Sequence, residues 1–67
     1  MTLSKIIEQA RRVADGGWDG QWIGNMADES MTVLATMGLT YQSGEYLHLT
    51  KRGEDLLALA ERAAGAD

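Results

Sequence analysis

Three segments of the chain repeat apolar residues every three or four positions, the spacing that places side chains on one face of an α-helix. The pattern predicts helices over residues 3–15, over the segment from Asn25 to Met37, and over the residues that follow Thr50. Hydroxyl or amide side chains can cap the helix starts, and glycines can end them. The expected caps are Thr2 or Ser4, Asn25 and Thr50, and the expected terminating glycines are Gly16 with Gly17, Gly38 and Gly65.

Apolar and polar residues alternate in two short runs between the second and third predicted helices. The runs are Leu39–Gln42 and Tyr46–Thr50, and Ser43 with Gly44 between them can supply the positive φ of a tight turn. The alternation predicts an antiparallel β-hairpin. We expect Leu39, Tyr41, Leu47 and Leu49 to face inward, and Thr40, Gln42 and His48 to face outward.

The segment between the first two helices is rich in glycine and holds both tryptophans. Residues 16–24 contain four glycines together with Trp18 and Trp22, and we expect an ordered loop with one helical turn. Ordering so many glycines costs backbone entropy, which burial of the two indole rings in a chain without Phe would offset. This favours both as core side chains, and the alternative is that at least one is an exposed interface anchor.

Length and composition predict one small α+β domain spanning residues 1–67, in the order helix, loop, helix, β-hairpin, helix. With 67 residues there is room for one core, and the absence of Cys excludes disulfides and thiol chemistry. No apolar run approaches the roughly 20 residues that span a bilayer, and the start lacks a signal-peptide pattern. We therefore expect a cytoplasmic protein without a membrane partner.

Charge is distributed unevenly along the chain, whose net charge is −4. No Lys or Arg occurs from Val13 through Thr50. The carboxylates within that stretch are Asp15, Asp19, Asp28, Glu29 and Glu45. Such a stretch predicts a negative surface that steers the protein towards a basic partner.

The residues that catalysis requires are not assembled in this sequence. His48 is the only histidine, and the alternation gives it neither metal-ligand companions nor a triad. The serines have no matching base, and the acidic residues do not form a calcium-loop pattern. We predict a protein without enzymatic activity, cofactor or metal.

Residues Val33 to Leu57 resemble the second half of winged-helix domains. The resemblance rests on Leu-x-x-Met-Gly-Leu over residues 34–39, a short hairpin, Leu-Thr-x-x-Gly over residues 49–53, and a pair of leucines at 56 and 57. It implies a winged-helix-like domain in which Asp28 to Thr36 is the recognition helix and Gln42 to Glu45 the wing. Within residues 28–36 there is no Lys, Arg, Asn or Gln, the residues that contact phosphates and base edges, and two carboxylates begin the segment.

Small size, a glycine-rich loop and this charge pattern are also similar in general character to phage-encoded inhibitors of nucleic-acid machinery, including anti-CRISPR proteins that imitate DNA. We therefore expect a protein-binding module, a DNA-mimicking inhibitor of a basic nucleic-acid-binding protein or complex, without tight DNA binding of its own. A winged-helix transcriptional regulator is the alternative, and a homodimer remains open. The expected partner-binding residues are Asp15, Asp19, Asp28, Glu29, Glu45, Trp18 and Trp22.

Overall fold

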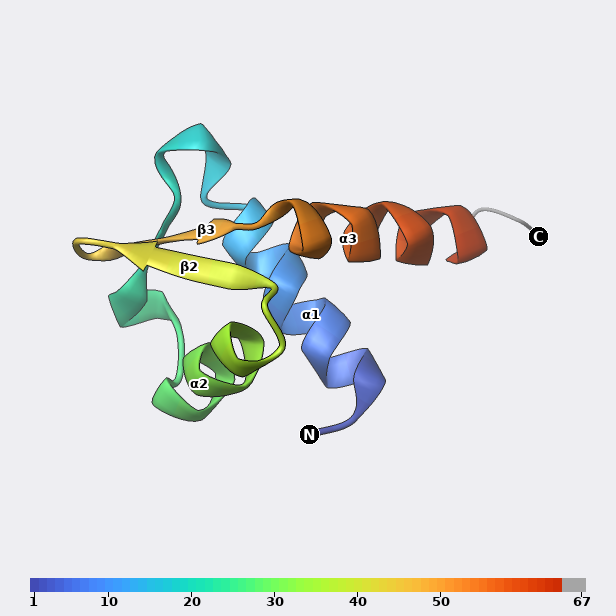
Figure 1. Ribbon diagram of the computed structural model, residues 1–67, viewed down its shortest axis with the longest axis horizontal. Helices are drawn as coiled ribbons and strands as arrows, with labels where there is room; N and C mark the ends of the chain where they lie inside the picture. Colours follow the sequence, from blue (N-terminus) through green and yellow to red (C-terminus); the bar gives the residue numbers. More distant parts are fainter. Residues whose placement is uncertain (65–67) are drawn as a thin grey trace.

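The computed structural model describes residues 1–64, which form an α+β domain of three α-helices and a three-stranded antiparallel sheet (Figure 1). Two short 3₁₀ turns, η1 and η2, lie in the glycine-rich segment. In chain order the elements are α1 (Leu3–Ala14), η1 (Gly17–Asp19), β1 (Gln21–Trp22), η2 (Ile23–Asn25), α2 (Asp28–Thr36), β2 (Thr40–Ser43), β3 (Tyr46–Leu49) and α3 (Lys51–Ala64). Within residues 1–64 no helix is long and apolar enough to cross a membrane.

The three predicted helices are confirmed, together with the predicted caps Thr2 and Thr50 and the terminating glycine Gly38. The Oγ1 of Thr2 accepts a hydrogen bond from the Lys5 amide at 3.3 Å, and Gly38 follows α2 with φ of 72°. The predicted Asn25 cap is wrong because α2 begins three residues later, after Ala27 at its N-cap. The predicted end of the last helix at Gly65 lies outside the described residues.

The predicted hairpin is also confirmed, and a third strand that the sequence pattern did not predict joins it. Gly44 takes a φ of 63° in the turn between β2 and β3. Strand β1 pairs with the other side of β3, with Gln21 opposite Leu47, so the sheet order is β1-β3-β2. The glycine-rich segment is therefore part of the sheet, where we expected a loop with one helical turn.

On β2 the inward and outward assignments of Thr40 and Tyr41 are wrong, whereas Gln42 is exposed as expected. Thr40, expected outside, is 5% exposed, whereas Tyr41, expected inside, is 53% exposed. Leu39 is buried as expected, but it lies in the turn that leaves α2, where its amide donates to the Leu34 carbonyl at 2.9 Å. The strand begins at Thr40, opposite Leu49, and a shift of one residue moves every side chain to the other face.

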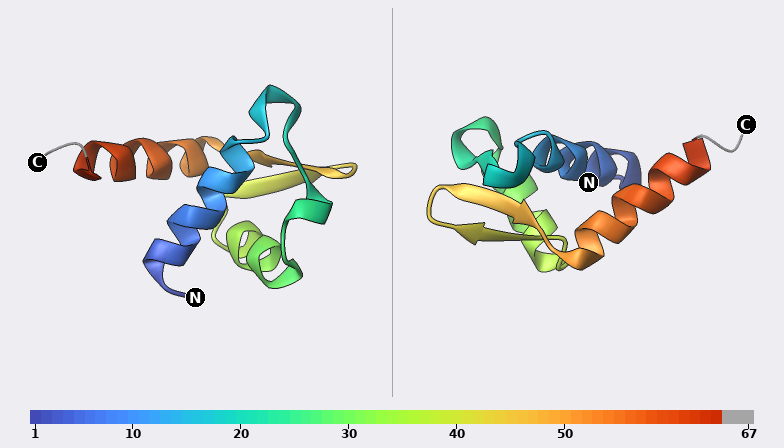
Figure 2. Two further views of the ribbon diagram at one scale, coloured as in Figure 1. Left: turned by 180° about the vertical axis from the view of Figure 1, so that it is seen from behind. Right: turned by 90° about the horizontal axis from the view of Figure 1, so that it is seen from above.

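The core lies between the helices and the inner face of the sheet. α1 runs along one side of the hairpin in the view from above in Figure 2, and it contacts β3, α2 and α3. The buried apolar side chains are Ile6, Ala10, Val13, Met26, Leu34, Leu39, Leu47 and Leu57. Leu3, on the predicted apolar stripe of the first helix, is 62% exposed because the N-terminal turn of α1 lies beyond this core.

Thr50 and Gly53, which belong to the Leu-Thr-x-x-Gly motif, join α3 to the end of α2. The Thr50 hydroxyl donates to the Gly38 carbonyl at 2.6 Å and accepts from the Gly53 amide at 3.2 Å, as the predicted cap of α3. The Thr50 amide donates to the Leu39 carbonyl at 2.9 Å. A Cβ at Gly53 would overlap that same carbonyl, so only glycine fits there without a shift. These motif residues hold the helices and hairpin together.

Candidate partner-binding surface

A chain of side-chain hydrogen bonds holds the glycine-rich segment against the end of α1. The amide of Gln21 donates to the Arg12 carbonyl at 2.6 Å, and the amide of Asn25 donates to Oε1 of Gln21 at 2.9 Å. Arg12 reaches back to the Asn25 carbonyl at 3.5 Å. Asn25, expected as a helix cap, therefore fixes η2 instead. Polar contacts provide the ordering that we expected from buried indole rings.

Both tryptophans are exposed, so their interpretation as core side chains is wrong. Trp18 is 96% exposed on η1, and Trp22 is 51% exposed on β1. Trp22 covers Gly24, where a Cβ would overlap its ring. An indole that remains in water after folding contributes little to stability and is available to a partner. Both residues therefore stay candidates for partner binding, on two different elements.

The acidic residues of the cation-free stretch are exposed and belong to separate elements. Asp15 is the C-cap of α1, Asp19 ends η1, and Glu45 lies in the hairpin turn. Asp28 and Glu29 form the first turn of α2, where carboxylates interact favourably with the helix dipole. The two 3₁₀ turns and the hairpin tip lie at the end of the molecule away from the C-terminal turns of α3 (Figures 1 and 2). Within residues 1–64 no three metal-ligating side chains gather.

The fold places one cationic side chain, that of Arg12, beside the glycine-rich segment. Arg12 precedes the cation-free stretch in sequence, but its guanidinium lies beside η2 through the bond to Asn25. At the start of α3, Lys51 pairs with Asp55 at 3.7 Å between exposed side chains, a contact of small energetic value. The Arg12 guanidinium therefore lies at the edge of the glycine-rich segment, where it donates to a backbone carbonyl.

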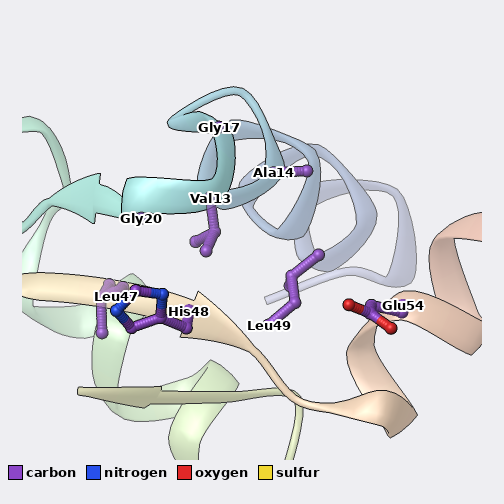
Figure 3. A pocket seen from close by; sticks show the side chains of 8 residues that line it. All are labelled: Val13, Ala14, Gly17, Gly20, Leu47, His48, Leu49 and Glu54. Carbon is purple, nitrogen blue, oxygen red and sulfur yellow. The ribbon is translucent and has the colours of Figure 1, made fainter. Parts of the chain in front are cut away.

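An open hollow of about 280 Å³ lies between the end of α1, η1 and β3 (Figure 3). Val13 and Leu49 point into it from opposite walls, and His48 and Glu54 lie on either side of Leu49. Its lining consists of Val13, Ala14, Gly17, Gly20, Leu47, His48, Leu49 and Glu54. This volume is slightly below the range of about 300 to 1,000 Å³ of small-molecule sites, and the imidazole and carboxylate do not converge on one point.

The hairpin carries two further exposed aromatic side chains that sequence analysis did not select. Tyr41 and Tyr46 are 53% and 45% exposed on β2 and β3. The sequence contained one indication of this exposure: Tyr46 and His48 are two residues apart in a predicted strand, so they share a face, and His48 was expected to face outward. The alternation predicts Tyr41 on the inner face, so it does not indicate that Tyr41 and Tyr46 share an exposed face.

Comparison with known proteins leaves the site to be interpreted from its own chemistry. No protein-family model, curated protein or solved structure matches this chain. Two features of the described residues stand out: exposed carboxylates without interspersed cations, and aromatic rings that remain exposed after folding. Both are properties of surfaces that bind other macromolecules.

Proposed function

We propose that this protein is a small acidic, non-enzymatic binding module that engages a basic nucleic-acid-binding protein and competes with the nucleic acid for it. The observation that supports this most directly is the exposure of Asp19, Glu45 and the Asp28–Glu29 pair on segments that contain no lysine or arginine. Carboxylates in such an array present negative charge where DNA presents phosphates. Inhibition by imitation of DNA, as in anti-CRISPR proteins, is the form of this function that we favour.

The mechanism is electrostatic steering followed by exclusion. Exposed charges of one sign accelerate encounter with an oppositely charged groove, and the gain decreases as salt screens the field. Once seated, the domain occupies the groove and its bulk keeps phosphates out. No bond is made or broken, and the charged side chains need only remain accessible.

A winged-helix transcriptional regulator remains the second candidate, because the order β1-β3-β2 and a helix directly before the hairpin are similar to the arrangement of winged-helix domains. In that function α2 would enter the major groove and the β2–β3 turn would contact the backbone. The described start of α2 opposes this, since Asp28 and Glu29 would approach phosphates without a cation on the helix to offset them.

The association rate with a lysine-containing peptide tests the proposed function. We expect rapid, salt-dependent association with the natural sequence, and a markedly slower rate with little salt dependence after Asp28→Lys and Glu29→Lys together. Both positions are exposed, so the fold should be retained. Arg11→Ala, which changes an exposed charge of the other sign, is the control and should leave the rate nearly unchanged. An unaltered rate in the double variant at low and high salt would make these carboxylates ordinary solvated surface.

A further inference from the structure

The aromatic rings of the three strands all lie on one face of the sheet. Trp22 is opposite Tyr46, and Tyr41 is opposite His48, so each pair shares a face. Tyr46 and His48 are two residues apart on β3, which places both pairs on the same side. We call these four residues, Trp22, Tyr41, Tyr46 and His48, the aromatic sheet face.

This face is the outer one. Thr40 and Leu47, which alternate with its members, are 5% and 3% exposed on the core side, whereas Trp22, Tyr41 and Tyr46 each keep about half of their surface in water. Three half-exposed aromatic side chains on so small a sheet make its outer face an aromatic platform. Aromatic rings of this kind dominate the energetics of protein interfaces.

The platform is ordered before any partner arrives. The rings of Tyr41 and His48 stack with centroids 5.2 Å apart and planes 24° apart. His48 also lies against Gly20, where a Cβ would be 2.8 Å from the imidazole Cε1. Trp22 is held in the same way over Gly24. Rings fixed in this manner lose little further entropy on binding.

The charges around the platform select a cationic ligand. The three strands and their turns contain no lysine or arginine, while Glu45 directly precedes Tyr46 and Asp19 directly precedes Gly20. Aromatic faces attract cations, and the planar guanidinium of arginine can also stack on them, which an ammonium cannot. Nucleobases stack on aromatic rings as well, but binding a single nucleic-acid strand also requires cations next to its phosphates. The three β-strands and their turns contain no lysine or arginine.

We propose that the aromatic sheet face is the docking site for an arginine-bearing segment of the basic partner. This rests on the proposed function, since it names the chemistry by which the partner is held after the carboxylates have attracted it. The guanidinium groups stack on the rings of Trp22, Tyr41 and Tyr46. Glu45 and Asp19 border the site and complement the positive charge.

Two peptides of equal length and charge, one with arginines and one with lysines in the same glycine and serine background, test this by calorimetric titration of the full chain. We expect the arginine peptide to bind roughly tenfold more tightly. Tyr41→Ala should reduce that ratio towards one, and Tyr41→Phe, which keeps the ring, should retain it. Leu59→Ala is the control, because it removes a side chain that is 60% exposed on α3, away from the face.

Trp22→Ala should also lower the arginine preference, and circular dichroism of this variant shows whether the domain still folds when the ring that covers Gly24 is removed. If the Trp22→Ala variant does not fold, the peptide affinities of Tyr41→Ala alone decide whether the arginine site exists. The Asp28→Lys and Glu29→Lys double variant should weaken both peptides by a similar factor and so preserve the ratio.

The possible failures are distinguishable. Equal affinity for the two peptides would overturn the arginine site while the proposed function stands, because charge alone then explains binding. If neither peptide binds, the proposed function and this inference both fall. Tight binding of a single-stranded oligodeoxynucleotide that is lost in Tyr41→Ala would overturn the inference in another way, by making the face a platform for bases.

Discussion

Two parts of the molecule use glycine in different ways. From Gly38 to Gly53 the glycines allow a positive φ or a close approach between elements. The apolar side chains of these elements are buried in the core. From Gly16 to Asn25 the glycines allow a tight path that Gln21 fastens by hydrogen bonds, and the aromatic residues remain outside. Burial stabilises the first part, whereas polar contacts define the second and leave Trp18 and Trp22 exposed.

Removal of core volume from the first part should have the largest effect. Leu57 is buried on α3, and Leu57→Ala should lower the free energy of unfolding by about 2 to 5 kcal/mol because it leaves a cavity in a small core. Leu59→Ala, at an exposed position of the same helix, should cost under about 0.5 kcal/mol. Thermal unfolding followed by circular dichroism compares the two. Equal melting temperatures would show that α3 does not pack as described.

Substitution of Gly53 by alanine should cause the second largest loss in the free energy of unfolding. Intrinsic helix propensity alone would make Gly53→Ala stabilising by about 1 kcal/mol. The new Cβ would meet the Leu39 carbonyl, and we expect a net loss of about 1 to 3 kcal/mol in chemical denaturation. Ala58→Gly, at an exposed site of α3, should cost about 1 kcal/mol and calibrates the propensity term. A Gly53→Ala protein that is more stable than the parent would refute the close approach.

Loss of Gln21 should open the second part without unfolding the first. Gln21→Ala removes two hydrogen bonds that join β1 to α1 and η2, worth about 1 to 2 kcal/mol together. Amide hydrogen exchange should accelerate at Ile23 and Met26 more than at Leu34. Gln42→Ala, which removes one exposed bond to the Gly44 carbonyl, is the matched control. Uniform acceleration in both variants would mean that the two parts unfold as one.

A gain of stability is expected at Thr40. Its Oγ1 is buried and, in the part of the chain that the structure describes, is the side-chain atom left without a hydrogen-bond partner. Thr40→Val keeps the shape and removes that polar atom, which should raise the free energy of unfolding by about 1 kcal/mol. Thr32→Val, at an exposed position of α2, should give no such gain. A less stable Thr40→Val protein would indicate that the hydroxyl is satisfied.

The smallest effect is expected at the most exposed aromatic residue. Trp18→Ala should change the free energy of unfolding by less than about 0.5 kcal/mol, since the indole is 96% exposed on η1. A destabilisation comparable to that of Leu57→Ala would restore the interpretation of Trp18 as a core residue, which the structure contradicts. Chemical denaturation of both variants under the same conditions makes the comparison direct.

The contrast between the two parts also explains what the sequence could predict. Helical and alternating periodicities located α1, α2, the hairpin and α3 because those elements bury an apolar side. Strand β1 is two residues long and offers no period to detect. The position of Leu39 shifted the expected faces of β2, because a buried residue in the turn after α2 looks like the first residue of the strand.

The sequence predicted the exposed carboxylates of the candidate site but not its exposed aromatic side chains. Asp19, Glu45 and the Asp28–Glu29 pair are exposed, as carboxylates without partners generally are. Exposure of Trp22 depends on a sheet edge that arises from long-range pairing with β3, and exposure of Tyr41 depends on the register of β2. Tertiary pairing decides both, so local pattern alone favoured the inner position for each.

Titration of duplex DNA against the purified chain discriminates between the proposed binding module and the winged-helix regulator. For the proposed binding module we expect dissociation constants no tighter than about 10⁻⁴ M near physiological salt, because α2 and the hairpin turn present carboxylates where phosphate binding requires cations. A specific nanomolar complex that weakens steeply with added salt would contradict it and would establish the winged-helix regulator in its place.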